Sequence, residues 1–101
     1  MIAMPAKVIG AQKRMARYYI QRLRDMNTLY KQGGRNIRHA LDQYDAESNQ
    51  IEQTLAWLHT HTNDDEDVAD LFNDMLIAGR MIFMNRIKFS DLLPFLNNAL
   101  A

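Results

Sequence analysis

The sequence predicts an all-α protein of four or five helices, and three observations lead to that prediction. Apolar residues recur at intervals of three and four along most of the chain, which is the period of one helix face. Only 4 glycines and 2 prolines occur among the 101 residues, so long helices are permitted. Hydrophobic residues make up 48% of the chain, enough to build one core, and the length fits a single domain. We expect the helices to pack as antiparallel pairs.

The first expected helix runs from about residue 5 to 32, after a frayed start at residues 1–4. Pro5 suits a first helical turn, where its missing N–H is no loss. Gly33 and Gly34 are expected to end the helix, because glycine reaches the positive φ that closes a helix C-terminus. The apolar stripe of this helix consists of Ala16, Tyr19, Ile20, Leu23, Met26, Asn27 and Tyr30.

Two helical segments, at about 36–44 and 45–60, are expected after the glycines. Asn36 can cap the first of them, and Asp45 can cap the second with Glu47 in its first turn. One continuous helix over this range is the alternative, and we favour a break or kink near Asp45. The long basic helix is expected to pack against this segment, with Leu23, Met26, Tyr30, Ile51, Leu55 and Leu58 in one buried cluster.

A polar connection then leads to a helix at about 65–84 and a last helix at about 90–101. Asp64 or Asp65 can cap the former, whose acidic first turn matches the positive end of the helix dipole. Ser90 can cap the latter. The apolar stripe of the 65–84 helix consists of Val68, Leu71, Phe72, Met75, Leu76, Gly79, Ile82 and Phe83.

The net charge is zero, but the charges are separated along the chain. Residues 1–38 hold nine Lys or Arg and one Asp, giving +8. Residues 39–74 hold ten Asp or Glu and no Lys or Arg, giving −10, and residues 75–101 add +2. Such charges can pair within the molecule or with a neighbour. A nucleic-acid binder is more often basic overall, so this balance disfavours nucleic acid as the partner.

Two groups of side chains are candidates for an interaction surface. The basic residues Lys13, Arg17, Arg24 and Lys31 lie along one flank of the first stripe. The apolar residues Leu92, Phe95, Leu96 and Leu100 crowd the last helix. The basic start of the chain also fits a transit peptide or a membrane-surface helix, although a solvated flank of a core helix explains it adequately.

The sequence contains no constellation of residues that indicates catalysis, a cofactor or a metal. His59 and His61 precede an acidic run, but a spacing of two does not place both on one helix face, and no further ligand is fixed. Gly33-Gly34 is followed by Arg35-Asn36 instead of the Gly-Lys-Ser/Thr of a phosphate-binding loop. The lack of cysteine suggests a reducing cytoplasm, and no apolar run is long enough for a membrane span. We therefore expect a cytoplasmic protein that is not an enzyme.

Several spaced motifs together resemble a known family. They are Ala16-Arg-Tyr-Tyr19, Leu29-Tyr-Lys-Gln-Gly-Gly34, Ala40-Leu41, Tyr44-Asp45-x-Glu47, Gln50-Ile51, Ala56-Trp57-Leu58 and Leu93-Pro-Phe-Leu-Asn-Asn-Ala-Leu100. This pattern is similar to the helical segment between the nucleotide-binding switch and the tetratricopeptide repeats of bacterial signal-transducing ATPases of the NB-ARC (STAND) type. The resemblance covers about residues 14–101. It implies a tetratricopeptide-like helical bundle or the start of a short right-handed solenoid, with no catalytic residue to carry over.

The function expected from these observations is a non-enzymatic module for protein–protein interaction or signal relay, as a fragment of a larger signalling ATPase. The alternative is a basic-faced module that binds nucleic acid or an anionic surface. Because a repeat unit buries each face against the next, the apolar last helix predicts a homodimer.

Overall fold

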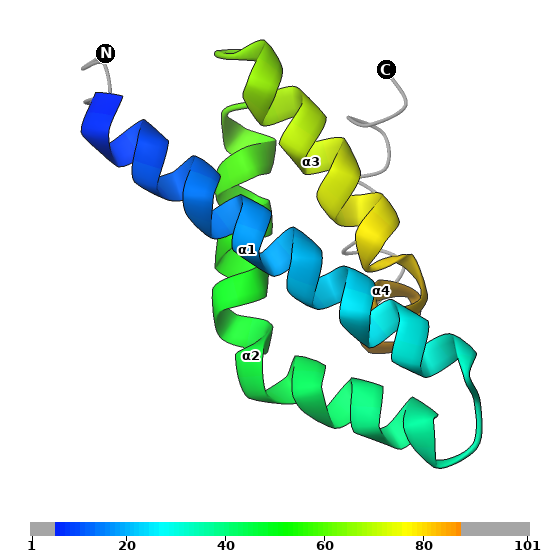
Figure 1. Cartoon of the computed structure of the whole chain (residues 1–101). Helices are drawn as coiled ribbons and strands as arrows, with labels where there is room; N and C mark the ends of the chain where they lie inside the picture. Colours follow the sequence, from blue (N-terminus) through cyan, green and yellow to red (C-terminus); the bar gives the residue numbers. More distant parts are fainter. Residues whose placement is uncertain (1–5, 88–101) are drawn as a thin grey trace.

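The protein is all-α, as the helical periodicity predicts. The computed structural model describes residues 6–87, and these residues form four helices and no strand (Figure 1). The helices are α1 (Ala6–Lys31), α2 (Arg35–Thr60), α3 (Glu66–Ala78) and α4 (Arg80–Arg86). The helix expected at about 90–101, with its cap at Ser90, lies outside the described residues.

The corner between α1 and α2 confirms the predicted helix stop. Gly33 and Gly34 have φ angles of 76° and 58°, and they are the described residues with positive φ. The N–H of Gly33 donates to the carbonyl of Tyr30, which closes the last turn of α1. The chain can therefore reverse within three residues, and the first half of α2 returns along α1 (Figure 1).

The segment 36–60 forms one bent helix, in place of the two separate helices expected at 36–44 and 45–60. Figure 1 shows that the ribbon of α2 turns sharply about midway along its length. Asp45 does not cap a new helix; its carboxylate accepts a hydrogen bond from Arg86 at 2.9 Å. Ser48 Oγ donates to the carbonyl of Asp45 at 3.3 Å, a back-bond that often accompanies helix bending.

The helix expected over 65–84 is divided at Gly79 into α3 and α4. Asp65 caps α3 as predicted, since its carboxylate accepts from the N–H of Asp67 at 2.8 Å. A Cβ on Gly79 would lie only 2.8 Å from the ring of Phe83 and 3.0 Å from Leu23. The glycine thus allows this turn to approach α1 closely, and the change of direction buries Phe83 in the core.

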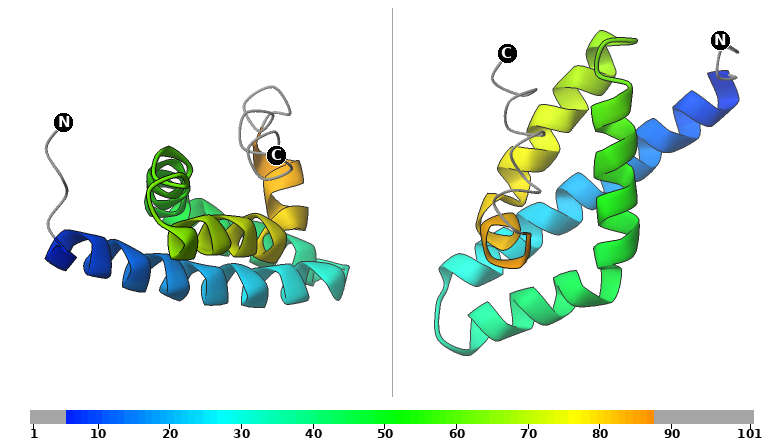
Figure 2. Two further views of the ribbon diagram at one scale, coloured as in Figure 1. Left: turned by 90° about the horizontal axis from the view of Figure 1, so that it is seen from above. Right: turned by 180° about the vertical axis from the view of Figure 1, so that it is seen from behind.

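The end of α1 that begins at Ala6 projects beyond the other helices. Both views in Figure 2 show this end extending past α2 and α3, whereas the opposite end of α1 packs on one side against α2, α3 and α4. The bend of α2 is the reason, because its second half crosses α1 and leaves it instead of following it to the start (Figures 1 and 2).

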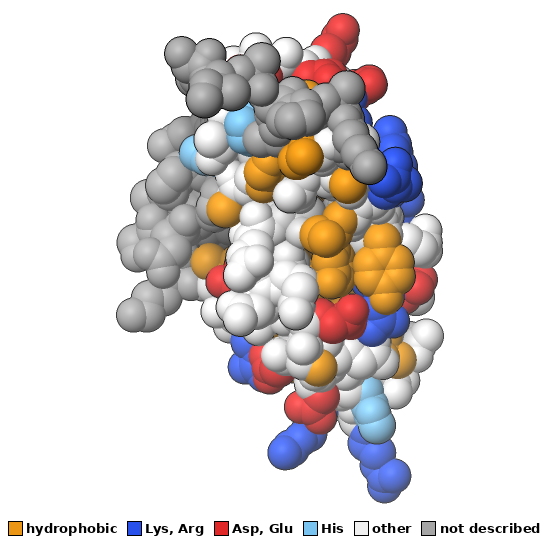
Figure 3. Space-filling view, turned by 90° about the vertical axis from the view of Figure 1, so that its left-hand side faces the viewer, with side chains coloured by type: hydrophobic (Ala, Val, Ile, Leu, Met, Phe, Trp, Pro, Cys, Tyr) orange, Lys and Arg blue, Asp and Glu red, His pale blue; other side chains and the backbone are white. Residues whose placement is uncertain are grey.

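Ion pairs join the basic and acidic regions of the sequence. Apart from His61 with Asp64, each ion pair between described residues links a residue of the acidic region 39–74 to a cation outside it. Figure 3 shows Lys or Arg and Asp or Glu side chains lying next to one another on the lower part of the face in view. Part of the charge separation is therefore neutralised inside the molecule.

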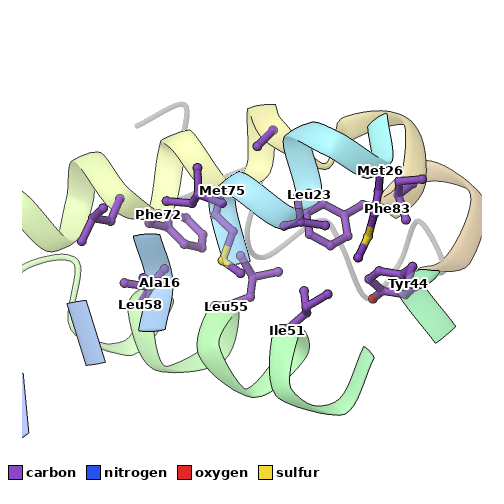
Figure 4. Packing of buried hydrophobic residues seen from close by; sticks show 14 of the residues in the cluster. Ala16, Leu23, Met26, Tyr44, Ile51, Leu55, Leu58, Phe72, Met75 and Phe83 are labelled. Carbon is purple, nitrogen blue, oxygen red and sulfur yellow. The ribbon is translucent and has the colours of Figure 1, made fainter. Parts of the chain in front are cut away.

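The core lies where α1, α2 and α3 meet and continues under α4 (Figure 4). Of the predicted cluster, Leu23, Met26, Ile51, Leu55 and Leu58 are all at most 1% exposed, whereas Tyr30 is only partly buried at the edge. The remaining buried hydrophobic residues are Ala16, Ile20, Ala40, Tyr44, Val68, Leu71, Phe72, Met75, Ala78, Ile82 and Phe83. The stripes predicted for the first helix and for the 65–84 region therefore face one another.

Candidate interaction surface

Lys13, the first of the four basic candidates, is already paired within the chain. Its Nζ donates to Asp65 Oδ2 at 2.7 Å and lies 3.5 Å from Asp67 Oδ2. The bond to Asp65 raises the pKa of Lys13, and the same bond, with the N–H of Asp67, lowers the pKa of the Asp65 carboxyl. Lys13 thus ties α1 to the start of α3, and its side chain is only 17% exposed.

The other basic candidates, Arg17, Arg24 and Lys31, are exposed on α1 at intervals of seven residues. Arg24 and Lys31 line one shallow depression together with Asp74 and Ile77 of α3, and Asn27, Thr28 and Ala78 complete its walls. Arg17 lies two turns away and is not part of it. The structure therefore brings two of the four cations together with an exposed apolar residue.

The apolar candidates Leu92, Phe95, Leu96 and Leu100 lie outside the described residues. The interaction surface expected on the last helix therefore stays a prediction.

Two ion pairs hold the bend of α2, and sequence reasoning missed both. Arg22 of α1 donates from Nε to Glu47 Oε2 at 3.1 Å and also bonds it through Nη2, and Arg86 of α4 bonds Asp45. The bond to Glu47 raises the pKa of the Arg22 guanidinium. Asp45 and Glu47, which were expected at a helix start, instead bind other helices: Asp45 binds α4 and Glu47 binds α1.

His59, in the last turn of α2, and His61, in the polar connection to α3, both lie beside aromatic rings. His61 Nδ1 lies 2.8 Å from Asp64 Oδ2, and its ring lies 4.6 Å from the ring of Trp57. The ring of His59 lies 5.5 Å from that of Phe72. Among the described residues, no three His, Cys, Asp or Glu side chains converge in a way that could hold a metal ion.

A second apolar stripe on α1 is the surface feature that sequence reasoning missed. Val8, Met15 and Tyr18 are large hydrophobic residues that are 42%, 45% and 56% exposed, and Ala11 between them is exposed as well. The Tyr18 ring packs edge-to-face on Tyr19 with centroids 5.0 Å apart. The spacing 8, 11, 15, 18 was a visible signal, but it was weaker than the core stripe of the same helix.

In Figure 3 the N-terminal end of α1 faces the viewer, and hydrophobic side chains gather there beside a group of Lys and Arg side chains. Arg14 and Arg17 are exposed cations of this part of α1, and neither has an ion-pair partner among residues 6–87. We call the four residues Val8, Ala11, Met15 and Tyr18 the α1 stripe. An apolar stripe beside a cation that has no ion-pair partner among the described residues is suited to binding.

No helix within residues 6–87 is long and apolar enough to cross a membrane. Comparison with protein-family models, with curated proteins and with solved structures gave no match, so the resemblance to signal-transducing ATPases stays a prediction.

Proposed function

We propose that this chain is a non-enzymatic helical module that binds another protein. The observation that carries the proposal is the α1 stripe, in which three large hydrophobic side chains remain between 42% and 56% exposed. Exposed apolar residues that are contiguous along one helix, and not scattered singly, are typical of protein contact surfaces. Arg14, which lies between Ala11 and Tyr18 on the helix surface, provides orientation and selectivity in the same place.

Site-specific photocrosslinking tests this proposal in the cells that express the protein. A photoreactive p-benzoylphenylalanine replaces Tyr18 in one variant and the exposed Gln53 of α2 in the control variant. We expect one discrete adduct with a different protein at position 18 and none at position 53. No adduct at position 18, or the same adducts at both positions, would contradict a protein-binding role for the stripe.

The relation to a signalling ATPase and a tetratricopeptide-like arrangement stay part of the proposal, and their support is the sequence resemblance. We expect the open reading frame to encode a nucleotide-binding domain before this segment and helical repeats after it. Flanking sequence without either would remove this part of the proposal and leave the binding role standing.

The predicted homodimer depends on the apolar residues of the 90–101 segment. Light scattering after size exclusion, at tens of micromolar and in both low and high salt, measures it directly. A dimer that persists in high salt would assign the association to apolar contact, whereas a monomer under both conditions would refute it.

A further inference from the structure

We propose that the α1 stripe is the docking site for a single acidic amphipathic helix of another protein. This inference rests on the proposed function and names the chemistry of the partner. Four observations support it: the spacing of the stripe, the helix that leaves it uncovered, the charges beside it, and its width.

The spacing of the stripe is that of a helix–helix seam. Its residues follow one another at intervals of three, four and three, which is the a/d pattern of a heptad. The stripe spans residues 8–18, or about 15 Å at 1.5 Å per residue. It is separate from the buried stripe of α1, whose members Ala16, Ile20 and Leu23 are at most 4% exposed.

Further along the same edge of α1, a helix already occupies the equivalent position. Arg22, seven residues after Met15, contacts α2 through Glu47, and Leu29, seven residues further on, packs against the core. A straight α2 would continue along this edge toward Val8. Because α2 bends about midway along its length, its second half crosses α1 instead of following it, and no helix among the described residues lies along the α1 stripe (Figures 1 and 2).

The charges beside the stripe favour an acidic occupant. With Val8 at a and Ala11 at d, Arg14 occupies the flanking g position, whereas Arg17 is at c, on the far side of Arg14 from the stripe; α1 contains no acidic residue before Asp25. Two copies of the stripe packed antiparallel would bring Arg14 of one copy close to Arg14 of the other, which disfavours self-pairing. Glutamates at the e and g positions of a foreign helix would instead pair with Arg14.

The width of the stripe favours a helix over a membrane or a nucleic acid. Two apolar residues in seven form the narrow seam of a helix pair, whereas a helix lying in a bilayer surface needs a broader apolar face. A nucleic acid would contact the cations and leave Met15 and Tyr18 in water.

The test measures binding of a defined acidic helix to the whole chain. The probe is a fluorescein-labelled synthetic peptide of three heptads, with Leu at a and d and Glu at e and g, at a concentration where it is monomeric. A second peptide has Lys at e and g. Fluorescence anisotropy is read for the parent chain, for Met15→Glu, and for the control Met84→Glu, which changes an exposed methionine of α4 that is 69% exposed.

We expect the acidic peptide to bind at least tenfold more tightly than the basic one. Met15→Glu should weaken its binding at least tenfold, and Met84→Glu should leave it within twofold of the parent. The double variant Arg14→Glu, Arg17→Glu should reverse the preference between the two peptides. Circular dichroism confirms that each variant keeps the helical content of the parent.

Four outcomes would overturn the inference. Two concern the peptide: no binding of the acidic peptide up to several hundred micromolar, or equal effects of Met15→Glu and Met84→Glu on its affinity. The third is that the parent chain sediments with phosphatidylserine vesicles and Met15→Glu abolishes this. The fourth is that the parent chain is a dimer and Met15→Glu converts it to a monomer. The crosslinking experiment at position 18 separates this inference from the proposed function. A heteromeric adduct without peptide binding refutes only the acidic helix, whereas the absence of both refutes both.

Discussion

At the residue scale, Gly34 has the most demanding backbone conformation of the corner between α1 and α2. Its φ of 58° and ψ of −134° fall in a region that glycine dominates. No heavy atom beyond its two chain neighbours lies within 4 Å of a Cβ built there, so a substitution would meet backbone strain alone. We expect Gly34→Ala to lower the free energy of unfolding by about 1–3 kcal/mol, measured by urea denaturation.

Gly10→Ala is the matched control, because Gly10 lies inside α1 and its Cβ would be an ordinary 3.6 Å from Arg14. An alanine inside a helix should raise stability by about 0.5–1 kcal/mol. If Gly34→Ala proves as stable as Gly10→Ala, the result would contradict a positive φ at Gly34. Gly33→Val and Gly34→Val should destabilise in the same sense as Gly34→Ala, since both glycines have positive φ.

Gly79 is required for a different reason, which is the space between α1 and α4. Its own φ of −103° is open to any residue, but a Cβ would meet the Phe83 ring at 2.8 Å. We expect Gly79→Ala to cost about 1–3 kcal/mol of unfolding free energy through overpacking. The double variant Gly79→Ala, Phe83→Leu should lose less unfolding free energy than the two single variants lose together, because the smaller side chain at position 83 makes room for the methyl group. Strict additivity would place the strain elsewhere.

At the element scale, Tyr44 holds the two halves of α2 together across the bend. Its hydroxyl donates to Glu52 Oε2 at 3.2 Å, eight residues further along, and its ring packs edge-to-face on Phe83 with centroids 6.0 Å apart. In a straight helix these two residues would be separated by about 12 Å along the axis. The bend is therefore filled by α4 and secured by a hydrogen bond within α2.

Removing that hydroxyl gives a prediction with a definite pH dependence. Burial, and then the charge of Glu52, raise the pKa of Tyr44 above its ordinary value. The fold thus favours the neutral phenol, so this stabilisation is complete below about pH 10, the unfolded pKa, and is lost as the pH rises further. We expect Tyr44→Phe to cost about 0.5–1.5 kcal/mol at neutral pH.

Urea denaturation between pH 8 and 11 measures both effects for Tyr44. Above pH 10 the parent should lose stability more steeply than Tyr44→Phe. Tyr18→Phe serves as the control, since Tyr18 is 56% exposed, and it should follow the parent closely. Parallel curves for the parent and Tyr44→Phe would show that the hydroxyl is not buried.

At the scale of the whole molecule, the link between Lys13 and Asp65 joins the basic and acidic parts of the fold. The pKa of Asp65 is lowered by Lys13, so its contribution to stability is present above the unfolded pKa of about 4 and is lost as the pH falls below it. Thermal melts between pH 2 and 7 should show a smaller loss of Tm on acidification for Lys13→Gln than for the parent.

A pair of variants separates the cap from the ion pair at Asp65. Asp65→Ser keeps an oxygen that can accept from the N–H of Asp67, whereas Asp65→Ala removes both interactions. We expect the Tm at pH 7 to fall in the order parent, Asp65→Ser, Asp65→Ala. Equal values for the two variants would mean that the cap contributes nothing beyond the ion pair.

The sequence by itself determined the features that depend on residues close together in the chain. The helical period, the corner at Gly33 and Gly34 and the cap at Asp65 are set by local backbone preferences and short-range hydrogen bonds. The core stripe of α1 was equally predictable, because a helix face that carries Ala16, Ile20 and Leu23 is favourable only when it is buried.

Only the tertiary structure decided the features that depend on which helix covers which face. The local sequence predicts Asp45 as a helix cap. In the fold, Arg86, 41 residues away, donates a hydrogen bond to the Asp45 carboxylate, and the helix continues through a bend. The helical pattern of 65–84 is interrupted at Gly79, where Leu23 and Phe83 leave no room for a Cβ. The exposure of the α1 stripe follows from the bend of α2. Whether a helix face is exposed depends on the path of another helix, and a local sequence pattern does not contain that information.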